Sequence, residues 1–312
     1  MSPKSGILTH EEKEAYERIN KSLAIQKKSF EDYVSKLSLQ NLQCIQETCD
    51  ALQLSIDIKT GNISYKPSFQ PLNLTYDICY VRHGKTEGNT EPRVFQGQVD
   101  YPENQLNHVG VQQAEEAAVL METLIKEQNW LPDVIILSPL NRAIETGSHF
   151  YNNHKEIPTV IVPEAAEICF GCWDNMRVID IPPNSLCHLF YLDQNALVRS
   201  PQASTINEKT RPDGYYKTGN QIPAESFLDV LVRMRKVLIS LENNKNIKNK
   251  SNQGLRPKVL MYGHSMAGAA VSILMGHGQY IQQSANSSKH LGFDGQCIMK
   301  HATPTLLLPK KP

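Results

Sequence analysis

Residues 80–89 carry the sequence Tyr-Val-Arg-His-Gly-Lys-Thr-Glu-Gly-Asn. The preceding residues, from 74 to 81, are rich in β-branched and aromatic side chains, which predicts a strand. This strand would end at Arg82 and His83 and turn at Gly84, at the sheet edge where ligands of open α/β proteins bind. Arg82 can bind an anionic oxygen through two parallel hydrogen bonds, and His83 can act as a base or nucleophile near neutral pH. The segment therefore indicates an anion site on an α/β sheet.

The same segment resembles the Arg-His-Gly-x-Thr-x-x-Asn signature of the histidine phosphatase superfamily, which includes the phosphoglycerate mutases. The matching residues are Arg82, His83, Gly84, Thr86 and Asn89. The resemblance implies a phosphohistidine nucleophile, and it implies that Asn89 and a glycine on the following loop, here Gly97, lie near the phosphate. The alternation of strands and helices independently predicts an α/β fold, a three-layer α/β/α sandwich with a mostly parallel central sheet.

Composition narrows the class of protein. The 312 residues include 32 Lys and Arg against 32 Asp and Glu, so no overall charge favours nucleic acid or anionic lipid. Apolar runs are too short to span a membrane, and the first residues lack the apolar core of a signal peptide. The 7 cysteines follow no disulfide framework, and Cys169-x-x-Cys172 has no second pair to complete a zinc site. We therefore expect a cytoplasmic protein with no bound metal, nucleic acid partner or membrane span.

The chain divides into an extension and a catalytic domain. Residues 1–72 are expected to form an N-terminal helical extension with a linker, in which 9 to about 54 show helical spacing and 55–73 are irregular. These helices would pack on the main domain, or contact a partner or a second copy of the chain. The catalytic domain would span 73–312, with a variable insertion at about 175–224.

A second motif follows a continuous apolar run at residues 132–137, which predicts a strand buried on both faces. Ser138 is predicted to cap the next helix, with Pro139 in its first turn. Arg142 would then lie near the positive end of the helix dipole, where an anion is favoured. The pattern resembles the family's second motif, in which this arginine binds the phosphoryl group.

A third motif follows a short strand predicted at residues 159–162. It resembles the family's Glu-x-x-x-Gly-x-Trp element, with Glu167 in the position of the acid that protonates the leaving oxygen. Glu164 is a second candidate for this role, and Asp174 departs from the glycine that many members carry.

The fourth motif is an imidazole on another turn from strand to helix. Residues 258–262 form the last strongly apolar strand, and His264 follows at the same sheet edge as His83. In the family this second histidine hydrogen-bonds the phosphoryl group. Members usually carry Ser-His-Gly, whereas this chain has Gly-His-Ser.

Four further segments complete the expected secondary structure. Asn107 is predicted to cap a helix that runs to about Lys126, and residues 223–227 resemble the family's Gly-Glu-Ser helix start. The Asn- and Lys-rich residues 242–254 are predicted to be a disordered or exposed loop. Residues 302–308 are expected to form a final edge strand.

The resemblance implies a two-step phosphoryl transfer without a metal or other cofactor. His83 attacks phosphorus, while Glu167 first protonates the leaving group and then activates water. The phosphoryl oxygens are surrounded by Arg82, Arg142 and His264. The implied activity is that of a phosphomonoester hydrolase acting on a phosphorylated small molecule or a phosphopeptide.

Three alternatives remain open from the sequence. A phosphoglycerate mutase-type phosphotransferase is disfavoured because the element around Glu167 lacks the Glu-Arg-His-Tyr-Gly form of glycolytic mutases. A catalytically dead scaffold would leave the retained polar motif residues unexplained. A serine esterase would use Ser265 in a nucleophile elbow, with Asp294 and His301 as its later acid and histidine.

Overall fold

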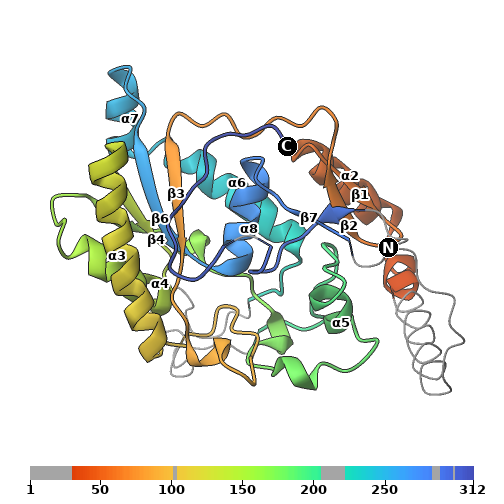
Figure 1. Ribbon diagram of the computed structural model, residues 1–312. Helices are drawn as coiled ribbons and strands as arrows, with labels where there is room; N and C mark the ends of the chain where they lie inside the picture. The colour runs from red at the N-terminus through yellow and green to blue at the C-terminus, as the bar shows by residue number, and fades with distance from the viewer. Residues whose placement is uncertain (1–29, 101–103, 205–221, 283–288, 298) are drawn as a thin grey trace, which may run out of the picture.

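A five-stranded sheet forms the centre of the computed structural model, which describes residues 30–100, 104–204, 222–282, 289–297 and 299–312 (Figure 1). Its strand order is β5-β4-β6-β3-β9. The bounds are β3 Asp77–Arg82, β4 Val134–Leu137, β5 Thr159–Ile161, β6 Lys258–Gly263 and β9 Thr305–Leu306. The first four strands are parallel, and β9 pairs antiparallel with β3 at one edge. The mostly parallel sheet and the final edge strand are therefore confirmed.

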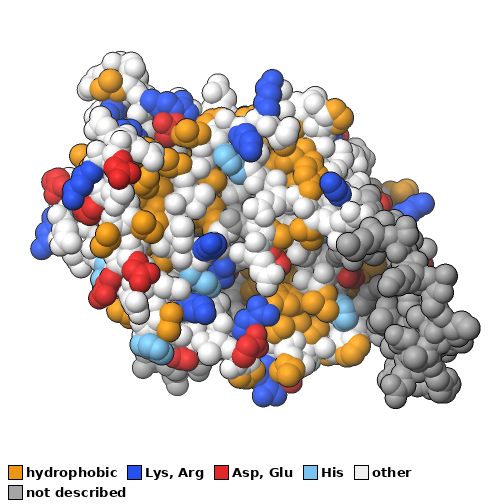
Figure 2. Space-filling model, in the orientation of Figure 1, with side chains coloured by type: hydrophobic (Ala, Val, Ile, Leu, Met, Phe, Trp, Pro, Cys, Tyr) orange, Lys and Arg blue, Asp and Glu red, His pale blue; other side chains and the backbone are white. Residues whose placement is uncertain are grey.

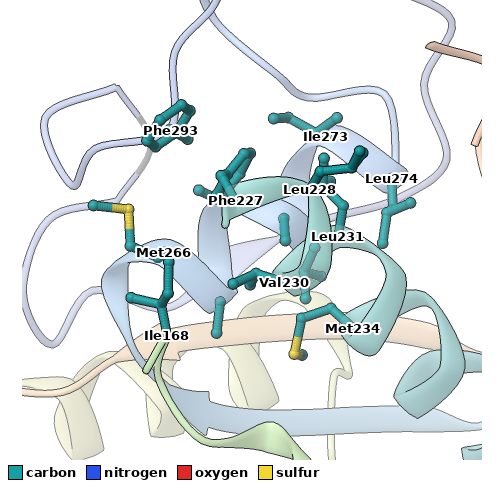
Figure 3. Close-up of a cluster of buried hydrophobic side chains, with 14 of the residues drawn as sticks. Ile168, Phe227, Leu228, Val230, Leu231, Met234, Met266, Ile273, Leu274 and Phe293 are labelled. Atoms are coloured by element: carbon teal, nitrogen blue, oxygen red, sulfur yellow. The ribbon is translucent and has the colours of Figure 1, made fainter. Parts of the chain in front are cut away.

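Helices cover both faces of this sheet. Alternate residues of each strand point to opposite sides, and both sets are buried in β3 and β4, so each face needs a covering layer. On one face Cys79 and Leu260 belong to the apolar cluster of α3 (His108–Gln128) and α4 (Asn141–Tyr151). The other face packs on α6 (Phe227–Leu241) and α8 (Ser265–Leu274), and side chains of both helices belong to the cluster shown in Figure 3, together with Ile168 and Phe293. The sandwich has three layers, as predicted.

Helix boundaries follow local capping. Asn107 caps α3, since its side chain accepts a hydrogen bond from the backbone of Gly110, as predicted. Ser226 and Asp229 form a reciprocal capping box at the start of α6. Small residues dominate α8, where Gly268 lies so close to Tyr80 that an added Cβ would come within 2.7 Å of its ring. These contacts fix the helices against the strands that end at the site.

The N-terminal region differs from its prediction at one point. Residues 30–35 are helical and α2 spans Leu39–Ala51, whereas residues 9–29 of the predicted helices lie outside the described residues. The prediction of an irregular linker is wrong, because β1 (Leu54–Asp57) and β2 (Asn62–Tyr65) form an antiparallel hairpin. Apolar and polar residues alternate in both segments, and this places buried side chains on one face.

The prediction of an exposed loop at residues 242–254 is also wrong. Helix α7 spans Lys245–Asn252, with Asn244 as its N-cap. Ile247 is fully buried, and Lys250 forms an ion pair with Asp133. The buried side chain of Ile247 and the N-cap Asn244 thus stabilise a helix in a segment whose composition alone indicates a loop.

The remaining elements are short. They are η1 Glu87–Asn89, η2 Pro163–Ala165, η3 Gly171–Trp173, η4 Val178–Asp180, α5 Leu186–Tyr191, β7 Tyr280–Ile281 and β8 His290–Leu291. Of the predicted insertion, the structure describes residues 175–204 and 222–224, which include η4 and α5. Within the described parts of the chain, no helix combines the length and apolar character needed to cross a membrane.

Candidate active site

Two imidazoles meet at the carboxyl edge of the sheet. Arg82 ends β3 opposite Gly263 at the end of β6, so the histidines that follow each strand are at the same level. The backbone N–H of His83 donates to the carbonyl of Gly263 over 2.9 Å. The ring centroids of His83 and His264 are 5.3 Å apart. The structure thus brings together the two predicted histidines, which are far apart in the sequence.

His83 is buried in one defined tautomer. Its Nδ1 lies 2.7 Å from the carbonyl oxygen of Gly84. A carbonyl can only accept a hydrogen bond, so Nδ1 carries the proton and Nε2 keeps a lone pair. Burial, followed by the positive charges of Arg142 and Arg82, holds the pKa of His83 well below its usual value. The ring is therefore neutral at physiological pH, with a lone pair on Nε2.

Arg142 lies beside this ring, although its helix begins later than predicted. The N-cap of α4 is Leu140, so the prediction that Ser138 caps this helix is wrong. Instead, the carboxylate of Asp100 accepts the backbone N–H of Asn141, with both oxygens at 2.9 Å. The hydroxyl of Ser138 lies 2.6 Å from Nε2 of His264 and is thereby engaged in the site.

The guanidinium of Arg142 orders the loop that carries Gly97. It donates to the carbonyl of Gly97 at 2.6 Å and to that of Val99 at 3.0 Å, and it lies 3.8 Å from the Asp100 carboxylate. Gly97 has a φ of +49°, and a Cβ there would come within 2.2 Å of a carboxylate oxygen of Asp174. Both the left-handed conformation and the close contact favour glycine at this position.

Asp174 lies behind this loop. Its carboxylate accepts a hydrogen bond from Ser204, and burial raises its pKa to about 7. Asp174, which departs from the family's glycine, is thus an ionisable carboxyl group near Arg142, in addition to Asp100. The positive charge of Arg142 lowers the pKa of Asp174 and so opposes the effect of burial.

Asn89 closes the turn after the nucleophile. Its side-chain oxygen accepts from both the backbone N–H and the hydroxyl of Thr86, at 3.3 and 3.1 Å. Thr146 of α4 accepts the N–H of Gly84 at 3.0 Å, which ties the same turn to the next helix. Asn89 thus shapes the loop and also lines the cavity.

Glu167 reaches the cavity from the segment after β5. Its carboxylate accepts three backbone N–H groups, those of Ile168 at 2.9 Å and of Met266 and Ala267 at 3.0 Å each. The last two belong to the first turn of α8, where a negative charge is favoured. Glu164, the other candidate, is exposed and lies outside this cavity.

An ion pair between α6 and the residues just before it fixes the segment that carries Glu167. Arg233 binds both oxygens of Glu225, at 2.6 and 2.8 Å, and the pair is largely shielded from solvent. The same guanidinium donates to the carbonyls of Glu164 and Ala166, at 2.7 and 2.8 Å. The Arg233–Glu225 pair thus links α6 to the backbone on the N-terminal side of Glu167.

A third imidazole, His301, was not assigned to this site from the sequence. Its Nδ1 lies 2.8 Å from the carbonyl oxygen of His83, and the two ring centroids are 5.6 Å apart. The predicted edge strand contained a signal for it. Because β9 runs antiparallel to β3, the residues just before β9 must lie at the carboxyl end of β3.

These side chains surround one cavity of about 620 Å³. Arg82 contributes a largely desolvated guanidinium, whose Nη1 donates to the carbonyl of Met299 at 3.3 Å. His264 is fully buried behind the wall. Figure 2 shows basic and histidine side chains gathered near the middle of the viewed face. The wall includes Arg82, His83, Asn89, Gly97, Arg142, Glu167 and His301.

Other chemistry finds less support in the described residues. They contain no group of three His, Cys, Asp or Glu side chains placed to hold a metal ion. Cys169 and Cys172 are free thiols. The side-chain bonds of Asp294 go to Gln194, Gln296 and Cys297 rather than to His301, so the triad of a serine esterase is absent from the part of the chain described.

Comparison with known proteins identifies the class. A family model described as "Histidine phosphatase superfamily (branch 1)" matches residues 78–187. A mannitol-1-phosphatase from Eimeria tenella is 41% identical over 296 residues, which cover 94% of this chain and 94% of that protein. The chain therefore belongs to the histidine phosphatase superfamily. It is a phosphatase, and the alternatives of a catalytically dead scaffold and a serine esterase are therefore rejected.

Solved structures with detectable similarity are more distant. The native structure of a mycobacterial glucosyl-3-phosphoglycerate phosphatase has a TM-score of 0.48 and 19% identity, covering 76% of this chain and 99% of that one. A phosphoserine phosphatase mutant from Entamoeba histolytica, bound to phosphoserine, has a TM-score of 0.42 and 20% identity, covering 64% of this chain and 79% of that one.

Proposed function

We propose that this phosphatase hydrolyses a hexitol 1-phosphate through a phosphohistidine at His83, without a metal ion. The observation that carries the proposal is the state of His83, whose Nδ1–H is bonded to the Gly84 carbonyl at 2.7 Å and whose Nε2 keeps its lone pair. Arg82 and Arg142 line the same cavity, and their positive charges act on the His83 ring. The hexitol assignment is supported by the 41% identity to the Eimeria tenella mannitol-1-phosphatase.

In the first step, Nε2 of His83 attacks phosphorus and forms an N–P bond while the P–O bond to the alcohol breaks. Arg82 and Arg142 stabilise negative charge on the transferring group, which is the main catalytic requirement of phosphoryl transfer. Glu167 gives a proton to the departing alcohol oxygen. Among the described residues, Oε2 of Glu167 accepts only the N–H of Met266, so its second lone pair can carry this proton.

In the second step, Glu167 acts as a carboxylate and takes a proton from water. The water oxygen attacks phosphorus, the N–P bond breaks and its electron pair returns to Nε2 of His83. Phosphate leaves, and Glu167 again holds the proton that the next first step needs. The backbone N–H groups around the carboxyl group of Glu167 stabilise the charged form that takes this proton from water.

The rest of the cavity suits a hydroxyl-rich alcohol. Gln113 and Glu116 of α3 line it, as does Thr303 of the C-terminal tail. Its volume of about 620 Å³ falls within the range typical of small-molecule sites. Amide, carboxylate and hydroxyl groups can together donate to and accept from several hydroxyls.

A substrate panel in EDTA tests the proposal. It should contain mannitol 1-phosphate, glucitol 6-phosphate, hexose phosphates, 3-phosphoglycerate and a phosphoserine peptide, with product analysis for phosphoryl migration. We expect the highest kcat/KM for a hexitol phosphate and no migrated product. His83→Ala should abolish turnover, while His108→Ala, at an exposed histidine on α3, should retain it. Equal rates across the panel would reject the substrate class, and loss of activity in EDTA would reject metal independence.

A further inference from the structure

We infer that His301 is a specificity residue, whose Nε2 accepts a hydrogen bond from a hydroxyl group of the substrate's alcohol part. This inference rests on the proposed function and adds to it the side chain that distinguishes a polyol from a plain alcohol. It starts from the place of His301 in the cavity wall, beside the nucleophile.

The C-terminal tail fixes the position of His301. Strand β9 pairs with β3 in a register that sets Thr305 opposite Tyr80. Nearer the site, the N–H of Ala302 donates to the carbonyl of Arg82 at 2.8 Å. His301 therefore cannot move away from His83 unless the edge of the sheet opens.

The orientation of the ring follows from its bond to the nucleophile. Nδ1 of His301 lies 2.8 Å from the carbonyl oxygen of His83, so Nδ1 carries the proton. Burial, together with the positive charge of Arg82, lowers the pKa of His301 to about 4. The ring is thus neutral at physiological pH, and Nε2 can only accept a hydrogen bond.

An acceptor at this place must bind a donor from the substrate. No described residue hydrogen-bonds Nε2 of His301, since the bond to His83 is the one its ring makes. Phosphoryl oxygens are themselves acceptors at neutral pH, so the lone pair on Nε2 of His301 cannot bind them. Arg82 and Arg142, in the same cavity, supply the positive charge that the phosphoryl group needs. A hydroxyl near the ester oxygen is the donor that a polyol phosphate supplies and a simple alkyl phosphate lacks.

Two variants of His301 separate its binding of a substrate hydroxyl through Nε2 from its hydrogen bond to the His83 carbonyl through Nδ1. In His301→Asn the side-chain amide can still donate to the His83 carbonyl, but nothing replaces Nε2. In His301→Gln the longer side chain can place an acceptor near the former Nε2. The substrates are mannitol 1-phosphate and hexyl phosphate, which share a primary phosphate ester and differ in their hydroxyl groups.

We expect the ratio of kcat/KM for mannitol 1-phosphate over hexyl phosphate to fall about two- to tenfold in His301→Asn, the range for loss of one neutral hydrogen bond. His301→Gln should keep the ratio within about twofold of the wild-type value. An unchanged ratio in His301→Asn, or equal losses on both substrates, would overturn the inference. If the wild-type enzyme does not prefer mannitol 1-phosphate over hexyl phosphate, the proposed substrate class fails as well.

Discussion

The guanidinium of Arg233 binds both carboxylate oxygens of Glu225, at 2.6 and 2.8 Å. The partners lie on α6 and just before it, yet the guanidinium also binds the backbone beside Glu167. This ion pair is largely buried, and its hydrogen bonds to the backbone go to the segment that carries Glu167. It therefore holds that segment in place. We interpret Arg233 and Glu225 as positioning residues for the acid, since neither lines the catalytic cavity.

Arg233→Ala should therefore lower kcat for hexitol phosphate about 100-fold while KM changes little, because a misplaced proton donor impairs the chemical step. Glu225→Ala should act similarly, and the double variant should be scarcely worse than either. A double-mutant cycle on kcat should therefore give a coupling energy close to the full effect of one variant, about 2.7 kcal/mol for a 100-fold loss. Lys236→Ala, at an exposed residue of the same helix, is the matched control. Additive losses would refute a shared role.

Replacement of Glu167 should separate good leaving groups from poor ones. We expect Glu167→Gln to reduce kcat/KM for mannitol 1-phosphate by about 10²–10⁴-fold, the usual contribution of a general acid or base. The loss for p-nitrophenyl phosphate should be much smaller in a pre-steady-state burst, because its phenolate needs no proton. Glu164→Gln, at the exposed alternative position, provides the comparison. Equal burst losses with both substrates would contradict the assignment of the acid.

The stability of the fold should depend on pH through His301. Its pKa falls from its usual 6.5 to about 4 on folding, so the unfolded chain binds a proton between these values that the folded chain does not. Stability is then complete above about pH 6.5 and is lost as the pH falls toward 4. This histidine alone should lower the free energy of unfolding by up to about 2 kcal/mol between pH 7.5 and 5.

Urea denaturation at both pH values provides the measurement. The difference between the two free energies of unfolding should be smaller in His301→Asn than in the wild type, because asparagine does not titrate. His83, whose pKa also falls on burial, should contribute in the same direction in both proteins. The same pH dependence in both proteins would show that His301 titrates normally in the fold.

Much of the fold could be predicted because strands and motifs coincide in this chain. The apolar runs before His83 and His264 are parallel strands, so their carboxyl ends had to meet. The spacing of Arg142 from its buried strand likewise predicted its place near the site. The helix cap could not be predicted as well, because Asp100, 41 residues before Asn141, binds the helix start that the sequence assigned to Ser138.

The rest depended on contacts between distant segments. The sequence suggests His301 only as a partner for Ser265, because its contact with His83 depends on the pairing of β9 with β3. The Arg233–Glu225 pair had no sequence signal, because its targets are backbone carbonyls. Helix α7 is ordered by Ile247, one apolar residue among polar ones, which composition alone does not reveal.

The central claim is that His83 carries the phosphoryl group between the two steps. Rapid quench in alkaline detergent after mixing the enzyme with phosphorus-labelled mannitol 1-phosphate, followed by peptide mapping at alkaline pH, tests it most directly. We expect label that is labile to acid and stable to alkali on the peptide containing His83 in the wild type and none in His83→Ala. With labelled p-nitrophenyl phosphate, whose leaving group needs no proton, the label should accumulate in Glu167→Gln. Turnover of the wild-type enzyme without labelled protein at any quench time, or label on another residue, would contradict the account.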